Sequence, residues 1–551
     1  MIAFLRRSMF PLTIAIVAAI FLGLFFLLPL LKVLSASFLD ATGSAFTSAN
    51  YRSVLSNRFF LNGLTNSLTT AALSSGFAIM LGVPFAFCIA RLPVRGKTAL
   101  LALVALPLVL PSFVSAYALV LMFGRAGIIT GWLHSLGVTF ESIYGIKGIV
   151  VTYTLTLFPY VVLPTVAAFK SIDVSVEEAA ENLGASRSRV LRTVTLPLVL
   201  PSILAGGVLV FIESMENFGV PFVLAEDKPI LSVEAFKLFV SETSANPASA
   251  GVLGMLLIIC TVIAMLIQRG LLSARRYATG AKRASPLLQV GSRSVQISTV
   301  FCWTVVALAL VPFGAVIAIS FLRFNGPVLH YEFSLDNFDQ LFSRSYWPLF
   351  NTLLLSGLAA IGGVVVGVPI GYFVVRYRTR VSAALDIIAT SPFAVAGTVL
   401  GIGLVLTYNN GWLILTGTSI IMVVAYMVRK LPFSVRSASA ILHQIDPSLE
   451  EASVGLGVPP FATFLRITAP LMIGGIVGAM VLTFVTVASE LSSTVVLYSG
   501  PWTTMTIAMF QALEGTSAGV AAAAATVLIV FTLVPVALLY RLLRRHELAL
   551  L

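Results

Sequence analysis

The chain has 551 residues; 58% are hydrophobic, only 10% are charged, and the mean hydropathy is +1.01. This composition excludes a soluble globular protein and is typical of a helical protein that crosses a membrane many times. The net charge of +12 does not indicate nucleic-acid binding, because the basic residues gather between apolar runs and follow membrane topology. We therefore expect membrane lipid around the chain and no nucleic-acid partner.

Apolar runs of about 20 residues predict an all-α polytopic fold with about twelve membrane-spanning helices. The runs of the first half lie near residues 9–31, 64–90, 99–123, 148–168, 196–222 and 250–268. The runs of the second half lie near residues 297–321, 350–375, 384–408, 412–431, 470–494 and 519–540. The first run is too long for the apolar core of a signal peptide, so we interpret it as an uncleaved span.

The placement of Lys and Arg predicts the orientation of these spans. With the N-terminus in the cytoplasm, 25 of the 34 basic residues fall in cytoplasmic segments. Arg6 and Arg7 precede the first span, and Arg429 and Lys430 are assigned to the cytoplasmic end of the tenth span. The sequence therefore predicts a multi-pass protein with both termini in the cytoplasm.

Two segments that lie 273 residues apart repeat each other. Ile172–Leu198 and Ile445–Leu471 align without a gap, with 11 of 27 positions identical. Earlier in the chain, Arg91 matches Arg376 at an offset of 285 residues. The second copy therefore lacks twelve residues, and we place the deletion in a shorter outer loop around Tyr408–Gly411.

Six spans per copy return the chain to the same side of the membrane, so the two copies form a parallel repeat. The pseudo-twofold axis of such a repeat lies along the membrane normal. We expect a first half at residues 1–269, a polar cytoplasmic linker at 270–296 and a second half at 297–551.

The repeated loops, at residues 171–197 and 444–470, are predicted to form a helix, a tight turn and a second helix. Asp446 followed by Pro447 is typical of a helix start. Two capping boxes of the form Ser-x-x-Glu are predicted, at Ser175–Glu178 and Ser448–Glu451. A glycine that ends the helix in the left-handed conformation is predicted in each copy, at Gly184 and Gly457. Two loops that are capped and turned alike indicate two equal docking surfaces for a shared partner.

Each loop resembles the EAA loop of ATP-binding-cassette importer permeases, which has Glu-Ala-Ala, a Gly soon after and a Pro before the next helix. The matching residues are Glu178-Ala179-Ala180, Gly184 and Pro197, and then Glu451-Ala452-Ser453, Gly457 and Pro470. The resemblance implies the type I permease fold, with two six-helix repeats, and a separate ATPase bound at each loop. The docking residues that it implies are Glu177, Glu178, Ala179, Gly184, Glu450, Glu451, Ala452 and Gly457.

Over most of its length the chain is similar to the fused permeases of iron(III) importers. This resemblance implies two copies of an ATPase subunit, a periplasmic binding protein that delivers the substrate, and a location in the bacterial inner membrane. Related permeases carry 2-aminoethylphosphonate, thiamine, polyamines or sulfate, so the substrate stays open among these and iron(III).

Three acidic residues lie inside predicted spans, where ionisable side chains are costly and mark functional positions. Glu213 and Glu216 share a face of the fifth span, and Glu490 lies in the eleventh. In the repeat, Glu216 aligns with Ser489 and Asn217 aligns with Glu490. The resemblance implies that these equivalent helices line the translocation path. Carboxylate oxygens suit a hard cation such as Fe(III); the alternative is that the acids pair with Lys or Arg.

The chain contains no GxxxxGK[ST] sequence for binding nucleotide, so we expect a permease rather than an enzyme, with ATP hydrolysed by its partners. Cys88, Cys260 and Cys302 lie in apolar runs without a CxxC pair, and we expect no metal site, disulfide or cofactor. A secondary transporter with six plus six spans is the alternative from another class, but it would leave the two capped loops unexplained.

Overall fold

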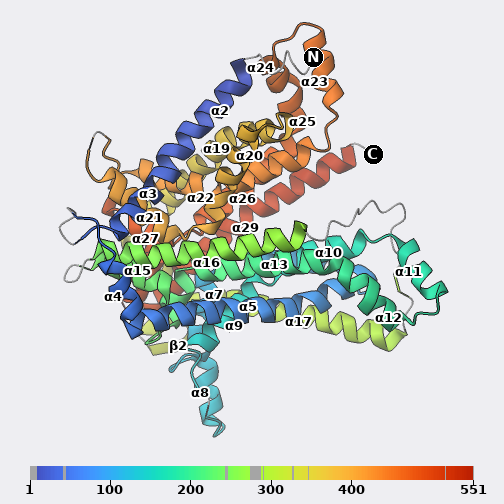
Figure 1. Ribbon diagram of the computed structural model, residues 1–551. Helices are drawn as coiled ribbons and strands as arrows, with labels where there is room; N and C mark the ends of the chain where they lie inside the picture. The colour runs from blue at the N-terminus through green and yellow to red at the C-terminus, as the bar shows by residue number, and fades with distance from the viewer. Residues whose placement is uncertain are drawn as a thin grey trace. The chain divides into compact units, whose positions relative to one another are not determined.

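The computed structural model (Figure 1) describes residues 9–40, 45–139, 141–241, 246–273, 287–288, 291–325, 328–344, 346–411, 413–515 and 517–549. Arg6 and Arg7 and most of the predicted linker at 270–296 lie outside the described residues. In the described part, helices dominate, and the one sheet is a two-stranded antiparallel hairpin of β1 (Leu322–Asn325) and β2 (Val328–Phe333). The prediction of a helical polytopic fold is confirmed, and this short hairpin is a local addition to it.

Two compact units divide the chain, and we name each after the repeat copy that supplies most of it. The first-half unit comprises Arg52–Glu234 and Leu256–Ala318, and the second-half unit comprises Met1–Tyr51, Ala235–Met255 and Ile319–Leu551. The sequence halves at 1–269 and 297–551 are thus divided differently from the compact units. Each unit contains the first long helix of the other sequence half.

Specific contacts hold each of these exchanged helices within its unit. In the second-half unit, the Tyr408 hydroxyl donates to the backbone carbonyl of Leu24 at 2.8 Å. In the first-half unit, the backbone N–H of Arg95 donates to the Thr299 hydroxyl at 3.3 Å. The exchange follows from these tertiary contacts, since nothing in the local sequence of either helix specifies its neighbours.

The first-half unit contains the helices of the first repeat in chain order. They are α5 (Arg58–Arg91), α6 (Lys97–Val109), α7 (Ser112–Phe123), α8 (Ile128–Ser135), α9 (Ile146–Leu157), α10 (Pro159–Lys170), α11 (Val174–Asn182), α12 (Arg187–Val190), the π-helical η2 (Leu191–Thr195), α13 (Leu196–Glu216) and α14 (Gly219–Leu224). Most of α17 (Ser292–Ser320) belongs to this unit, and α15 (Leu231–Val240) and α16 (Pro247–Ser273) are divided between the two units.

The second-half unit begins with the first long helix and continues with the second repeat. Its elements are α2 (Met9–Leu22), η1 (Gly23–Leu27), α3 (Leu28–Ser37), α4 (Ala49–Ser56), α18 (Asp336–Arg344), α19 (Trp347–Arg376), α20 (Arg380–Thr390), η3 (Ser391–Ala394), α21 (Gly397–Tyr408), α22 (Ser419–Leu442), α23 (Pro447–Gly455), α24 (Pro460–Thr463), the π-helical η4 (Phe464–Thr468), α25 (Ala469–Leu471), α26 (Ile473–Ala488), α27 (Thr494–Leu497), η5 (Gly500–Trp502), α28 (Met505–Glu514) and α29 (Ala518–Ala549), with α4 ending across the unit boundary.

Among the described residues, nine helices are long and apolar enough to cross a membrane, or up to eleven if each of two bent pairs is one span. The sequence predicted about twelve. The difference comes from the second copy: α22, at the tenth predicted span, is not among these helices, and the ninth and eleventh predicted spans are the two pairs bent by 109° and 75°. The third span is broken in both copies, between α6 and α7 and between η3 and α21. The breaks fall beside Pro111 and after Pro392, where a proline removes a helical hydrogen bond.

The helix at the tenth predicted span lies further along the chain than predicted. The sequence placed it at 412–431, but α22 runs from Ser419 to Leu442. Arg429 is therefore a mid-helix residue that is only 6% exposed, and it does not lie at the end of the helix as the sequence predicted. A buried partner, described below, makes this position tolerable for a cation.

The twelve-residue difference between the copies has a clear structural origin. α7 and α21 begin at Ser112 and Gly397, still 285 residues apart, whereas α9 and α22 begin at Ile146 and Ser419, which are 273 apart. The first copy holds the additional helix α8 in this interval, and in the second copy α21 ends at Tyr408, with no helix in the described residues before Ser419. The prediction of a shorter loop near Tyr408–Gly411 is confirmed.

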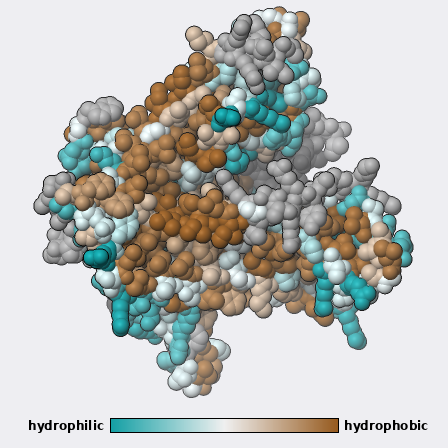
Figure 2. Space-filling view, viewed as in Figure 1, coloured by the Kyte–Doolittle hydropathy of each residue, from teal (hydrophilic) through white to brown (hydrophobic). Residues whose placement is uncertain are grey.

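Apolar side chains cover the flanks of the helices, and hydrophilic ones gather toward helix ends (Figure 2). On α2, exposed Leu12, Ile16 and Ile20 recur every four residues and so lie along one face. Such an exposed apolar face is what a lipid-facing helix requires.

Candidate functional sites: the docking helices and the buried acids

Each predicted docking helix begins at an aspartate cap. The carboxylate of Asp173 accepts from the Ser175 N–H at 3.0 Å, and that of Asp446 accepts from the Ser448 N–H at 2.9 Å. The backbone hydrogen bond from Ser448 holds the pKa of the Asp446 carboxyl below its usual range. The predicted Asp446–Pro447 start is confirmed. The capping boxes led by Ser175 and Ser448 are wrong, because each serine is the second residue of its helix and the aspartate is the N-cap.

Each docking helix ends as the sequence predicted. Gly184 and Gly457 follow the last turn with φ of 84° and 87°, in the left-handed region that an L side chain adopts only with strain. The residue just before each glycine is a leucine that points outward: Leu183 is 89% exposed and Leu456 is 86% exposed. These two leucines occupy the same position of the repeat.

The outer face of each helix combines apolar and acidic side chains. Val176 and Leu449, again equivalent, are 45% and 47% exposed. Glu178, Ala179 and Ala452 are exposed, as are both glycines, and Glu451 is half-buried. We call these outward residues, together with Leu183 and Leu456, the docking surfaces. Figure 1 shows α11 and α12 beyond the ends of α10 and α13, and α23 and α24 at one end of the second-half unit.

Glu177 and Glu450 face the other way. In the first copy, the Glu177 carboxylate pairs with the Arg91 guanidinium and accepts from the Thr195 hydroxyl at 2.7 Å. Arg91 is the last residue of α5, and its side chain is 4% exposed. Of the eight predicted docking residues, Glu177 therefore binds its own chain.

The second copy repeats this arrangement with more contacts. The Glu450 carboxylate pairs with Arg376 at 3.0 Å and accepts from the hydroxyls of Thr468 and Tyr372, each at 3.1 Å. Arg376 also donates to the backbone carbonyl of Ile445 at 3.2 Å, at the start of the loop. We call Glu177–Arg91–Thr195 and Glu450–Arg376–Thr468 the two inner clamps.

A π-helical turn lies near the end of the docking loop in both copies. It spans Leu191–Thr195 in the first and Phe464–Thr468 in the second, at the same position of the repeat. Beyond it, the first copy continues without a break into α13, whereas the second bends by 75° between Leu471 and Ile473. Single π turns interrupt the regular hydrogen-bond ladder of a helix, so each docking loop joins its span through an irregular segment.

The buried acids of the first half lie at the end of α13. Glu216 is the last residue of that helix and is 5% exposed. One turn earlier, Glu213 is hydrogen-bonded by the Tyr160 hydroxyl. Asn217 caps the helix: its amide donates to the Ser112 hydroxyl at 3.0 Å and its carbonyl accepts from the Val220 N–H at 3.0 Å.

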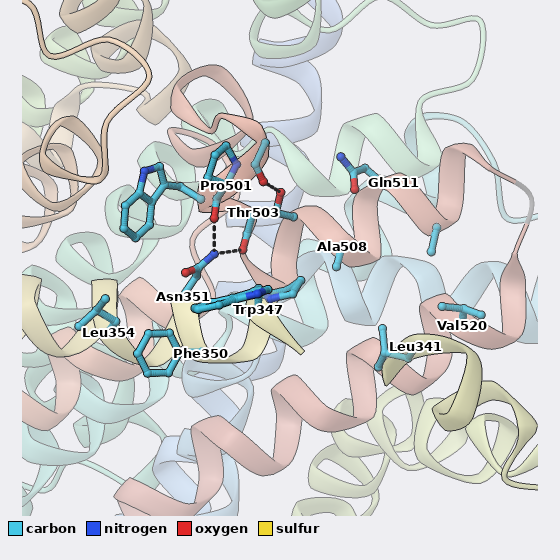
Figure 3. Close-up of a pocket in the computed structure, with 14 residues that line it drawn as sticks. Leu341, Trp347, Phe350, Asn351, Leu354, Pro501, Thr503, Ala508, Gln511 and Val520 are labelled. Atoms are coloured by element: carbon cyan, nitrogen blue, oxygen red, sulfur yellow. Dashed lines mark hydrogen bonds between the residues drawn. The ribbon is translucent and has the colours of Figure 1, made fainter. Parts of the chain in front are cut away.

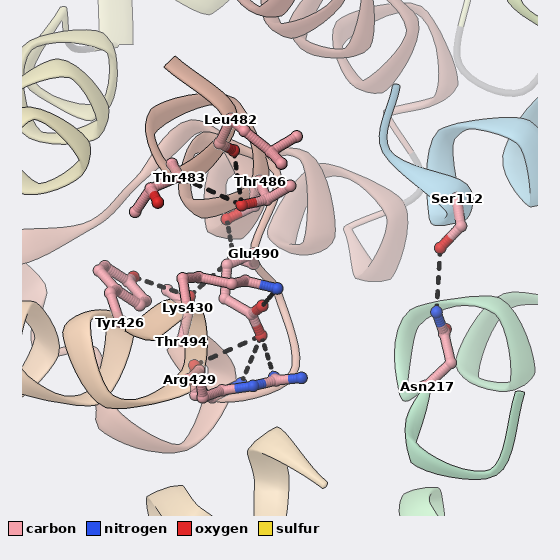
Figure 4. A network of polar contacts seen from close by, with 12 residues as sticks. Ser112, Asn217, Tyr426, Arg429, Lys430, Leu482, Thr483, Thr486, Glu490 and Thr494 are labelled. Carbon is pink, nitrogen blue, oxygen red and sulfur yellow. Dashed lines mark hydrogen bonds and ion pairs between the residues drawn. The ribbon is translucent and has the colours of Figure 1, made fainter. Parts of the chain in front are cut away.

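Glu490, the equivalent of Asn217, is paired with cations (Figure 4). Its carboxylate lies 2.6 Å from Arg429 Nη1 and 3.5 Å from Lys430 Nζ, and it accepts from the Ser493 N–H at 3.1 Å. The side chains of Arg429 and Glu490 are each 6% exposed. For Glu490, the structure therefore has the alternative in which the acid pairs with Lys or Arg. Its neighbour Ser489 is the C-cap of α26.

The comparisons with known proteins identify the family. Residues 78–277 and 363–547 each match the family described as "Binding-protein-dependent transport system inner membrane component". The chain belongs to this family. The two matched ranges begin 285 residues apart, which is the offset between Arg91 and Arg376.

Alignments with two curated relatives cover most of this permease. The "Ferric transport system permease protein FbpB" of Actinobacillus pleuropneumoniae is 29% identical, over 94% of this chain and 76% of the relative. FbpB 1 of Haemophilus influenzae is 30% identical, over 88% of this chain and 78% of the relative. The "Molybdenum transport system permease protein ModB" of Escherichia coli is 33% identical over 39% of this chain and 94% of its own length. The permease is thus a multi-pass inner-membrane subunit of an ATP-binding-cassette importer.

A cavity of about 560 Å³ lies in the second-half unit of the permease (Figure 3). Trp347, Phe350 and Leu354 of α19 form part of its largely apolar wall. Asn351 lies at its edge, and its amide donates to the carbonyls of Pro501 and Thr503, each at 2.9 Å. In the first copy, the equivalent Asn66 donates to the Pro229 carbonyl at 3.0 Å. These asparagines hold the loop after the fifth span of each copy against its long helix.

The partners of the inner clamps were not predicted from the sequence. Arg91 and Arg376 look there like topological charges, although they match in the repeat, and Thr195 matches Thr468 in the same way. Identity between the two copies was therefore the available signal. Ser453, which replaces an alanine of the motif, shares a hydrogen bond with the Thr463 hydroxyl at 2.9 Å. The first copy has Ala180 and Val190 at these positions, so this polar pair belongs to the second copy alone.

No group of three or more His, Cys, Asp or Glu side chains that could hold a metal ion occurs among the residues that the structure describes. The acids of the first half, Glu213 and Glu216, both interact electrostatically with Tyr153 and Tyr160.

Proposed function

We propose that this permease is the membrane subunit of an importer for iron(III), driven by two ATPase subunits and supplied by a periplasmic binding protein. The observation that carries the proposal is the duplication of the docking surface: Leu183 and Leu456 are exposed at matching ends of two matching helices. One chain therefore offers two equal surfaces, and two copies of one ATPase would satisfy both. The assignment of iron rests on relatives named for ferric transport that match most of the chain, whereas ModB covers 39% of it.

The topology that fits this role puts both docking loops and both termini in the cytoplasm. The excess of Lys and Arg beside these loops supports that orientation. The two sequence halves, 1–269 and 297–551, then carry one ATPase each, joined by a cytoplasmic linker at 270–296.

The translocation path is proposed to pass Glu213, Glu216 and Asn217 in the first half and Ser489 and Glu490 in the second. Glu213 and Glu216 offer hard carboxylate oxygens, which suit Fe(III). Glu490 is paired with Arg429 and Lys430, so a cation in the path would compete with these two residues for its carboxylate.

Reconstitution tests the proposed function directly. The permease, co-expressed with its ATPase and reconstituted in vesicles with the binding protein, is expected to take up Fe(III) only when ATP is supplied on the ATPase side. Two ATPase copies per permease are expected by mass measurement of the complex. Uptake of thiamine, a polyamine or 2-aminoethylphosphonate in place of iron would reassign the substrate. Uptake without any bound ATPase would instead favour a secondary transporter.

Glu216→Gln is expected to reduce iron uptake by about ten-fold while the complex still assembles. The exchange keeps the size of the side chain but removes its charge, and a lost interaction with a charged group is worth roughly 1.5–3 kcal/mol. Initial uptake rates, with the amount of assembled complex measured in parallel, check this result. Glu141→Gln is the matched control. Glu141 is 92% exposed, pairs with Lys147 at 2.6 Å and is not one of the proposed path residues. Wild-type uptake by Glu216→Gln would remove Glu216 from the path.

A further inference from the structure

The inner clamps determine what each docking helix is attached to. The chain itself connects α11 to α13 and α23 to α26, in both cases through a π-helical turn. The clamp adds a second connection, to the C-terminal residue of α5 or of α19, which are the long helices of 34 and 30 residues. Each docking helix is therefore joined to two membrane helices that are far apart in sequence.

The ion pair that joins the docking helix to the long helix is largely shielded from water. In the second copy, both side chains of the Arg376–Glu450 pair are 12% exposed, so water weakens their attraction little. Charge-assisted hydrogen bonds of this kind are about twice as strong as neutral ones. Thr468 adds a third element, because it belongs to the π turn and donates to the same Glu450 carboxylate as Arg376. The clamp thus fixes the docking helix, the π turn and the long helix to one another.

The adjacent glutamates divide two tasks between them. Glu178 lies on the exposed surface, whereas its neighbour Glu177 is turned toward Arg91. In the second copy, Glu451 and Glu450 show the same division, and Glu450 is 9% exposed. Successive residues of a helix point about 100° apart, so a pair of adjacent acids can serve a partner on one side and the protein's own core on the other.

We infer that Glu177 and Glu450 are positioning residues that transmit the movement of each docking helix to α5 or α19, in addition to the span that follows it in sequence. The inference rests on the proposed function, since an ATPase must move the docking helix. When the ATPases close, the clamp makes the long helix follow the docking helix. Without it, the π turn alone carries the displacement, and the long helix is left behind.

The two clamps are not equal. Tyr372 donates to Glu450, but the equivalent residue of the first copy is Phe87, which has no hydroxyl. Tyr372 also packs against Phe464 of the π turn, with ring centroids 4.9 Å apart. Loss of Glu450 is therefore expected to uncouple the permease more than loss of Glu177.

Glu450→Gln in the reconstituted complex tests this inference. ATPase association and the hydrolysis rate are expected to stay at the wild-type level, while Fe(III) transported per ATP hydrolysed falls about five-fold or more, within the usual range of coupling between sites. Glu177→Gln is expected to give a smaller fall. Charge exchange, Glu450→Arg with Arg376→Glu, is expected to restore part of the coupling, because it retains the ion pair without the hydroxyl contacts.

The control is an ion pair of the same unit that does not include the docking helix. Arg436 lies 3.3 Å from Asp386 and joins α22 to α20, so Arg436→Gln is expected to leave iron transported per ATP unchanged. If Glu450→Gln does not assemble, Glu177→Gln and Thr468→Val take its place. Wild-type coupling in every assembled clamp variant would overturn the inference while leaving the proposed function intact. A wild-type complex that binds no ATPase would overturn the proposed function itself.

Discussion

Leu183→Asp combined with Leu456→Asp is expected to abolish binding of the ATPase subunits. The two leucines are 89% and 86% exposed, and each is the C-cap residue of its docking helix. An apolar side chain that enters a pocket of a partner commonly contributes about 2 kcal/mol or more, which is about thirty-fold in affinity. A buried aspartate at the same place adds the cost of burying a charge.

Co-purification of the ATPase with the tagged permease measures this effect. Each single variant is expected to retain one ATPase per permease, and the double variant none, with iron uptake lost in all three. Leu136→Asp is the matched control, because Leu136 is likewise the C-cap of a short helix, α8, and is 59% exposed outside the docking surfaces. Full ATPase occupancy of the double variant would exclude these leucines from the interface.

Glu490→Gln is expected to destabilise the permease by about 3 to 5 kcal/mol, the usual effect of removing one partner from a buried ion pair. The exchange leaves the guanidinium of Arg429, with its 6% exposed side chain, and the ammonium of Lys430 without their carboxylate. It also replaces the charged carboxylate that accepts from the Ser493 N–H with a neutral amide.

Thermal unfolding of the purified permease in detergent measures this loss. The double variant Glu490→Gln, Arg429→Gln is expected to recover much of the stability, since replacing both members of a buried pair removes the uncompensated charge. Iron uptake by the double variant then separates two roles of Glu490. Recovered uptake shows that its charge serves the fold, whereas a stable double variant without uptake assigns the charge to the path. An unchanged unfolding temperature in Glu490→Gln would contradict the buried pair.

Local signals carried much of the prediction. The left-handed ends at Gly184 and Gly457 and the cap at Asp446 were predictable, because each depends on only a few neighbouring residues. The capping boxes failed for a local reason as well, because the aspartate two residues before each serine is the better-placed acceptor. The broken third spans were missed because an apolar composition does not report a change of direction.

The orientation of adjacent acids could not be predicted. Glu177 and Glu178 have the same chemistry, and only Arg91, 86 residues earlier, decides which of them turns inward. Likewise, the sequence predicts Glu490 within a path, and it places the partner Arg429, 61 residues away, at the end of another span. The fold brings these residues together, and neither residue has a sequence pattern that names the other.

The sequence by itself determined the membrane class, the duplication and the two docking helices, because composition, apolar run length and caps act over a few residues at a time. The tertiary structure decided which glutamates clamp and which lie exposed, which acid is neutralised, and which compact unit holds each first helix. A buried charge must find its counter-charge wherever the fold supplies one, so such pairings follow from packing across the whole chain.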